Sequence, residues 1–385
     1  MKNYLFLFVV LLLFSCTQNK KPNNELNTNI SKNETLSIIK AISIPIDTLP
    51  YNFEYTSIHK EDNELYFVGL DKPTNALYFY SITNQSFSHK IQKPTEGSEK
   101  FMIKQFYIHS KDSIFLLDDY GTKLQIVNIR GNNVCSFKFK NKQKTNIVEA
   151  SLGKGIIYFG RDNKIVLPSY VEIEDTKAEF YKYGFGSLFL LKNDSLSLIN
   201  DIGKFPDEYT PDKSSYFYYP SANMIKYNDN ILLSFSKNHN LFSLNVDKNK
   251  TSKLKKWKSS YLEEDFERLQ LNHDIQQGSN YVFTTGFYTL LKIDTETEIL
   301  YRIVKHPQPL KNTEGKLNQY LECGFSIMYG KIDDPNPKEV LLEKGKYVPY
   351  VVHSIGNNQL LISLENPFNP NNKENMLEFE IIELK

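Results

Sequence analysis

Few stretches of the sequence place reactive side chains at a spacing that supports catalysis. A nucleophile elbow needs Gly-x-Ser-x-Gly, so that the serine stands on a sharp turn between a strand and a helix. The nearest match is "YGFGSLF" at Tyr183–Phe189, where Ser187 lacks the second glycine and leads into a strand-like run. We therefore expect Ser187 to be structural. No HExxH motif, phosphate-binding loop or Cys/His zinc spacing occurs in the sequence, which predicts neither a metal nor a cofactor.

Three of the seven histidines, His59, His109 and His353, recur just before a polar turn that joins two apolar runs. A repeated fold places equivalent residues at equivalent positions, so repeat geometry explains these histidines better than a metal site does.

Other polar and aromatic residues gather in segments that follow apolar runs. Asp118 and Asp119 offer oxygen ligands of the kind calcium takes, although adjacent carboxylates at a strand end also cap turns. The tyrosines near residue 216 are suited to stacking on sugar rings or an apolar peptide, and ordinary packing is the alternative. The candidate ligand-binding residues are Asp118, Asp119, Tyr120, Lys123, Tyr216, Tyr218, Tyr219, His239, Arg302 and His306.

The elements that would position these residues are short strands. A hairpin unit, in which an apolar run meets a polar turn and a second apolar run follows, begins near residues 57, 107, 156, 224, 290 and 351. Regular recurrence of antiparallel hairpins is typical of a β-propeller. Further strand-like runs after the hairpins complete the blades, and the sixth blade lacks its outer strand. We expect the run at residues 35–46 to supply that strand, which gives an all-β, six-bladed propeller over residues 35–385.

Loops between second and third strands, and those from a fourth strand to the next blade, converge on one face of such a ring, the funnel face, where function is usually found. Three of these loops look long, at residues 170–186, 306–323 and 365–375.

One segment has helical periodicity. Ser260 and Glu263 have capping-box spacing, and Leu262, Phe266 and Leu269 fall on one face. The pattern predicts a short helix at residues 259–270, which covers a blade edge or, alternatively, docks a partner.

The start of the chain has the pattern of a targeting segment. An apolar run of about eleven residues, from Tyr4 to Phe14, is too short for a bilayer, which needs roughly 20, and fits a signal peptide. Leu13–Cys16 resembles the lipobox of bacterial lipoproteins, in which the cysteine is acylated. We expect a signal peptide at residues 1–15, a lipid on Cys16 that anchors the protein to a membrane, and a flexible tether to residue 34. Gln18, Asn19, Lys20 and Lys21 follow Cys16, where surface-exported lipoproteins of some Gram-negative groups carry acidic residues, and this favours an anchor that faces the periplasm. We expect that anchor to lie in the outer membrane.

Composition excludes some partners. The chain of 385 residues has 46 basic and 45 acidic side chains, so nothing marks it for nucleic acid. Apart from Cys16, only Cys135 and Cys323 remain, which we expect to be free and packed. We expect a monomer.

The stretch from Thr95 to Gly131 resembles the second blade of an uncharacterised family of six-bladed, TolB-like propeller lipoproteins of Gram-negative envelopes. The resemblance rests on Glu96 and Gly97, on "DSIFL" from Asp112, on Gly131, and on "LYRIV" around Arg302 with Glu343. The resemblance implies a propeller fold and a location in the cell envelope, and it supplies no catalytic residue. In addition, Thr48, Ser113 and Ser195 follow aspartates in a pattern similar to the sites of an envelope O-glycosylation system, although the same pattern is common in turns.

Three functional hypotheses follow. The first is a lipid-anchored binding module that holds a protein or glycan on its funnel face. The alternative is a propeller enzyme, a hydrolase or lyase acting on glycans or lactones, whose site is assembled from separate blades. A third possibility is a subunit of an envelope assembly.

Overall fold

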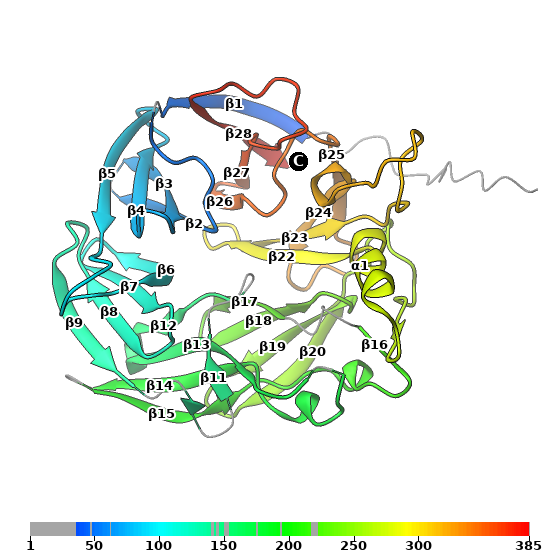
Figure 1. Cartoon of the computed structure of the whole chain (residues 1–385), viewed down its shortest axis with the longest axis horizontal. Helices are drawn as coiled ribbons and strands as arrows, with labels where there is room; N and C mark the ends of the chain where they lie inside the picture. Colours follow the sequence, from blue (N-terminus) through cyan, green and yellow to red (C-terminus); the bar gives the residue numbers. More distant parts are fainter. Residues whose placement is uncertain are drawn as a thin grey trace, which may run out of the picture. The chain divides into compact units, whose positions relative to one another are not determined.

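The computed structural model describes residues 36–384, apart from residues 47, 62, 140–141, 144–145, 150–153, 175, 193–194 and 217–221. Of the sheets that these residues form, six are antiparallel blades that follow one another around a ring, and a seventh has two short strands (Figure 1). The six hairpins predicted from the sequence are the first two strands of the six blades, so the predicted propeller is confirmed.

In each blade the chain runs from the strand nearest the centre outward. Blade 1 contains β2 (Tyr55–Glu61), β3 (Glu64–Asp71), β4 (Ala76–Ser81) and β5 (Ser86–Gln92). Blade 2 contains β6 (Ile103–Ser110), β7 (Ser113–Asp118), β8 (Lys123–Val127) and β9 (Asn133–Lys138). Blade 3 contains β12 (Ile157–Phe159), β13 (Lys164–Val171), β14 (Gly186–Lys192) and β15 (Ser195–Ile202), extended by β10 (Lys142–Gln143) and β11 (Asn146–Val148).

The second half of the ring has the same plan. Blade 4 contains β17 (Ala222–Tyr227), β18 (Asn230–Phe235), β19 (Asn240–Asn245) and β20 (Lys250–Lys256). Blade 5 contains β22 (Phe287–Asp294), β23 (Ile299–Lys305), β24 (Phe325–Lys331) and β25 (Lys338–Leu342). Blade 6 contains β26 (Val352–Gly356), β27 (Gln359–Ser363), β28 (Met376–Leu384) and β1 (Leu36–Pro45).

The ring closes through the N-terminal strand, as predicted. Strand β1 pairs antiparallel with β28, from Leu36 opposite Leu384 to Pro45 opposite Met376. Closure in this way pairs the edge that the last blade would otherwise leave open.

Turns and core follow from the residue pattern. Asn163 and Asn228 take positive φ angles of 51° and 52° in the turns after β12 and β17, a conformation that asparagine adopts more readily than most residues. Second and third strands are the most buried, as in β4, where all six residues are buried, because they face neighbouring blades on both sides. The hydrophobic clusters accordingly lie between adjacent blades.

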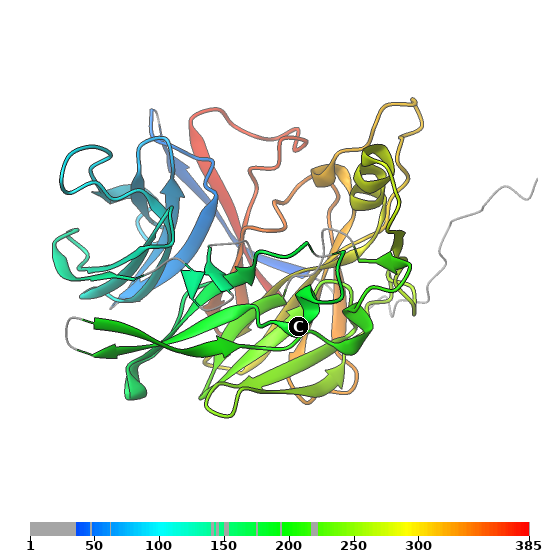
Figure 2. The ribbon, with the colours of Figure 1, turned by 60° about the horizontal axis from the view of Figure 1, so that its bottom comes forward.

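The α-helix of this part of the chain is not where the sequence pattern placed it. It is α1 (Ile275–Thr284), whereas residues 259–270 are irregular and end in the short strand β21 (Leu269–Gln270), which pairs with β16 (Ser214–Ser215). Figure 2 shows α1 and the loop after β23 standing out from blade 5 on the same side.

Tertiary contacts explain why residues 259–270 do not form the predicted helix. The Ser260 amide and hydroxyl both donate to Glu339 rather than capping a helix, and the backbone carbonyls of Glu263 and Glu264 accept from His239. The capping box lies instead at Asp274, whose carboxylate accepts from the Gln277 amide while the Gln277 side chain accepts from the Asp274 amide.

The three loops predicted to be long connect β13 to β14, β23 to β24, and β27 to β28. Short 3₁₀ turns occur in two of them, η2 (Phe180–Lys182) and η4 (Tyr320–Glu322); η1 (Gly160–Asp162) and η3 (Asp207–Tyr209) lie elsewhere in blades 3 and 4. Cys135 and Cys323 are free thiols, as expected, and burial raises the pKa of Cys323 to about 11. Cys16 lies outside the described residues.

Candidate functional site

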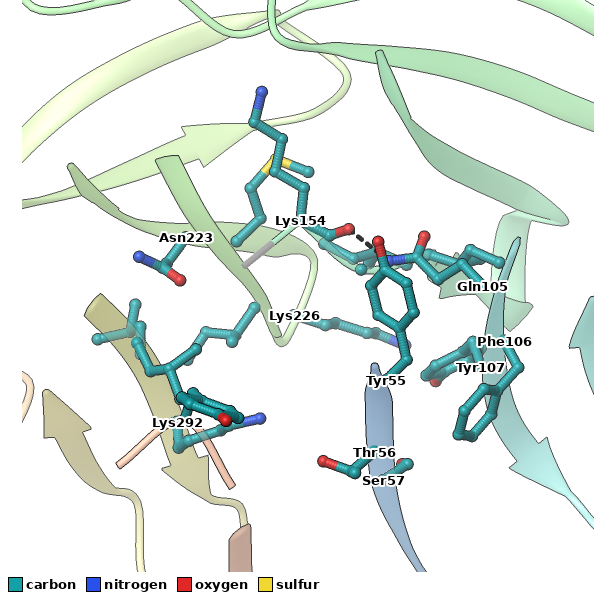
Figure 3. Close-up of a pocket in the computed structure, with 18 of the residues that line it drawn as sticks. Tyr55, Thr56, Ser57, Gln105, Phe106, Tyr107, Lys154, Asn223, Lys226 and Lys292 are labelled. Carbon is teal, nitrogen blue, oxygen red and sulfur yellow. Dashed lines mark hydrogen bonds between the residues drawn. The ribbon is translucent and has the colours of Figure 1, made fainter. Parts of the chain in front are cut away.

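A cavity of about 370 Å³ lies at the centre of the ring, lined by the innermost strands. Strands β2, β6, β12, β17 and β22 contribute directly, and the segments just before β2, β12 and β26 complete the wall. We call it the central cavity. Figure 3 shows its lining residues coming from segments that are far apart in the sequence.

Lys292, on β22, points toward the middle of this cavity (Figure 3). It is half-buried, and no hydrogen bond or ion pair joins its ammonium group to any residue that the structure describes. Removal from water lowers the pKa of Lys292 to about 8, because burial penalises the charged form. A cation without a counter-ion in a cavity is available to an anionic ligand.

Thr56 and His353 form a polar pair in the same region. The Thr56 hydroxyl lies 2.9 Å from Nε2 of His353. Burial, and after it the positive charge of Lys292, holds the pKa of His353 well below its ordinary value. The imidazole is therefore neutral, and it contributes hydrogen bonding rather than charge.

Two buried amides complete the polar wall. Gln105 on β6 donates to the Lys154 carbonyl at 2.8 Å, and Lys154 is bridged on its other side to Met224 of β17. Among the residues that the structure describes, the side-chain oxygens of Gln105 and Asn223 have no hydrogen-bond partner. Since a buried acceptor left unpaired costs about 1–3 kcal/mol, each would gain from a donor supplied by water or by a ligand.

Lys154 itself faces away from the middle of the cavity (Figure 3). Its ammonium lies 5.9 Å from the centre of the Phe185 ring, and burial lowers its pKa to about 8. Lys226 lies along the wall and donates to the Tyr158 carbonyl at 3.0 Å. Among the described lining residues, Glu54 is the one with a carboxylate, and this carboxylate is ion-paired with Lys72. The central cavity therefore has a positive potential.

A second cavity, of about 300 Å³, adjoins the first and shares Phe53, Thr56, Tyr350 and Val351 with it. We call it the mouth cavity. Its remaining wall comes from strands β3, β27 and β28 and from four connections: the segment before β2, the loops after β23 and β27, and the segment before β26. These are the connections that define the funnel face, where the sequence predicted the functional surface.

The residues that the sequence singled out lie elsewhere. Asp118 is buried and accepts from the amides of Thr122 and Lys123 at 2.7 and 2.8 Å, so it caps the turn after β7. Asp119 is ion-paired with Lys104, Tyr120 is exposed, and the Lys123 ammonium donates to the Lys100 carbonyl. Of the described residues, no group of three or more His, Cys, Asp or Glu is arranged to hold a metal.

A second group lies between blades 4 and 5. The Arg302 guanidinium is fully buried and donates to the Ser234 hydroxyl and to backbone carbonyls that include those of His239 and Trp257. Its plane lies over the Tyr288 ring, 3.2 Å from the centroid. Burial lowers the pKa of His239 to about 4, and its Nδ1 lies 2.7 Å from the Tyr288 hydroxyl. These residues hold two blades together.

His306 stacks on Tyr261, and its Nε2 lies 2.9 Å from the Ser326 hydroxyl, which donates to Glu339. The serine lies between the imidazole and the carboxylate, whereas in a catalytic triad the imidazole lies between the other two. Ser187 is also buried; its hydroxyl donates to Asp201 and lies 3.0 Å from the Ser169 hydroxyl. Both serines are structural.

Tyr216 is buried against Tyr209 and carries Arg268 over its ring; Tyr218 and Tyr219 lie outside the described residues. None of the described candidates lines the central or the mouth cavity. Sequence reasoning missed Lys292, Gln105 and Asn223. The available signal was a polar residue inside the first strand of a hairpin, where apolar residues dominate.

The ring of six sheets around a lined central cavity defines the protein as a six-bladed β-propeller. Residues 27–321 match the model of a protein family, "Domain of unknown function (DUF4221)", and the chain belongs to that family. No protein with a curated description matches the chain in sequence.

Two solved structures share the fold. A member of the same family from Bacteroides vulgatus has 18% sequence identity and a TM-score of 0.74, over 91% of this chain and 98% of that one. A candidate exported protein from Bacteroides fragilis has 12% identity and a TM-score of 0.55, over 91% and 95% of the two chains. At these identities the likeness shows the fold alone. In the part of the chain that is described, no helix is long and apolar enough to cross a membrane.

Proposed function

We propose that the protein is a binding module that takes a small sugar acid into the central cavity. The observation that carries this proposal is Lys292, a half-buried cation that faces the cavity without a partner among the described residues. A carboxylate placed beside it would form a charge-assisted hydrogen bond in a partly desolvated site, where such contacts are strongest.

The rest of the wall favours a sugar over other anions. A volume of about 370 Å³ lies at the lower end of the range of roughly 300–1,000 Å³ found for small-molecule sites. The aromatic residues Tyr55, Phe106 and Tyr107 line the same cavity as these polar groups. Pyranose rings present flat C–H faces to aromatic rings, and their hydroxyls supply donors of the kind that the amide oxygens of Gln105 and Asn223 lack.

The test is a calorimetric titration of the protein with glucuronate and, separately, with glucose, which has similar hydroxyls and no carboxylate. The Lys292→Met variant removes the cation and keeps most of the side-chain volume. We expect glucuronate to bind, glucose to bind at least tenfold more weakly, and Lys292→Met to weaken glucuronate roughly 30-fold. The control is Lys250→Met, which removes one exposed charge on β20.

The proposal is overturned if glucuronate does not bind, or if the two lysine variants have the same effect. Binding of an acidic peptide in preference to every sugar acid would replace the glycan with a protein partner. Release of a new product during the titration would favour the alternative, a propeller enzyme acting on the same ligand.

We also propose that a lipid on Cys16 anchors the protein to the outer membrane, facing the periplasm. The lipobox-like stretch at Leu13–Cys16 supports this address, as does the similar fold of a candidate exported protein. Intact mass of the protein from its native envelope should show loss of residues 1–15 and added acyl chains. A Cys16→Ser variant that still partitions with the membrane fraction would contradict the anchor.

A further inference from the structure

The mouth cavity has a different chemistry from the central cavity that it adjoins. Tyr51 and Tyr350 are exposed to 58% and 42% at its rim, and Glu365 contributes a carboxylate to its wall. The central cavity carries positive charge and the mouth cavity negative charge, so a ligand that spans them needs two unlike ends.

The Glu365 carboxylate has an oxygen that can accept a hydrogen bond from a ligand. The carboxylate is half-buried, and one oxygen accepts from the Glu378 amide at 2.8 Å. Burial, opposed by that hydrogen bond and reinforced by the charge of Glu378, raises the pKa of Glu365. No described residue is paired with its second oxygen. Neutral hydroxyls suit such a group, and a second carboxylate would be repelled by it.

The two exposed tyrosines add flat aromatic surface at the same place. Tyr350 lines both cavities, whereas Tyr51 lines the mouth cavity alone. With four lining residues in common, the cavities are close enough for one ligand to contact both.

On this basis, which rests on the proposed function, we propose that the mouth cavity is a second sugar subsite. The ligand is an oligosaccharide with a uronic acid at its end, held in the central cavity, followed by a neutral sugar that packs on Tyr51 and Tyr350 and donates to Glu365. A chain with uronic acids at both positions fits less well.

The experiment compares three ligands by calorimetry: glucuronate, a disaccharide of glucuronate linked to neutral galactose, and a disaccharide of two uronates. We expect the mixed disaccharide to bind about tenfold more tightly than glucuronate, and the double uronate to gain nothing over glucuronate. Tyr51→Ala should remove the tenfold gain and leave glucuronate unchanged. Glu365→Gln should bring the double uronate to within threefold of the mixed disaccharide.

The matched control is Tyr120→Ala, since Tyr120 is an exposed tyrosine on a loop of blade 2 that lines neither cavity. If glucuronate binds and the mixed disaccharide binds no better, the second subsite is wrong while the proposed function stands. Equal weakening of both ligands by Tyr51→Ala also overturns the subsite. If no ligand binds, the proposed function itself fails.

Discussion

The central cavity and the boundary between blades 4 and 5 both remove positive side chains from bulk water, but only one of them satisfies the charge. Arg302 has no exposed surface, and its donors are taken by the Ser234 hydroxyl and by backbone carbonyls. Lys292 faces a cavity with no partner in the described part of the chain. Burial of a charge therefore does not by itself indicate a binding site here; the proposed site is distinguished by a buried charge without a described partner beside open volume.

Lys305 belongs with Arg302 in this comparison. Its ammonium donates to the carbonyls of Phe283 and Thr285, at the C-terminal end of α1, at 3.1 and 2.8 Å. Free carbonyls and the helix dipole both favour a cation at this end of a helix. The lysine holds α1 against blade 5 and is not available to a ligand.

The largest expected effect is that of Arg302→Met. The substitution leaves several buried carbonyls without donors, and we expect a loss of about 3–5 kcal/mol in the free energy of unfolding. Urea denaturation measures it, with Lys250→Met as the control. A loss below about 1 kcal/mol would mean that the interblade network does not hold the blades together.

Lys305→Met should have a smaller effect of the same sign. Loss of its hydrogen bonds to the end of α1 is expected to cost about 2–3 kcal/mol. Lys292→Met should leave stability unchanged or raise it by about 1 kcal/mol, because it removes a desolvated charge that no described residue pairs with. If Lys292→Met destabilises the protein as much as Lys305→Met does, the proposed difference between the two lysines is wrong.

The smallest effect is a pH dependence. The folded-state pKa of Lys292, about 8, lies below the ordinary 10.5, so between these values the unfolded chain binds more protons than the folded one. The free energy of unfolding therefore rises from pH 8 to 10.5 as Lys292 loses its proton. Below pH 8 the destabilisation by its desolvated charge is fully present. The stability advantage of Lys292→Met over the unsubstituted protein should shrink between pH 7 and pH 9.5 in urea denaturation. A constant difference would contradict the desolvation of Lys292.

Much of the fold could be predicted because it is local. Each hairpin carries its own alternation and turn residues, and the unpaired run at residues 35–46 had one vacant position to fill, beside β28. The helix was misplaced because Ser260 and Glu263 have the spacing of a capping box, while contacts with Glu339 and His239 compete for the same groups. Such contacts join residues that are far apart in the sequence, and no local pattern reveals them.

The site was harder to predict for the same reason. Lys292, Gln105 and Thr56 are single polar residues in three separate strands, and only ring closure brings them around one cavity. His239 and Arg302 attracted attention as reactive types, yet the structure shows that their polar groups are occupied within the protein. A residue's type does not tell whether its partners lie inside the protein.

A crystal structure of the protein soaked with glucuronate would show whether the central cavity binds this ligand. We expect the carboxylate to lie within about 3.2 Å of the Lys292 ammonium, with the sugar ring against the aromatic residues of the wall. An empty central cavity at saturating glucuronate, or a ligand bound elsewhere with Lys292 untouched, would contradict it.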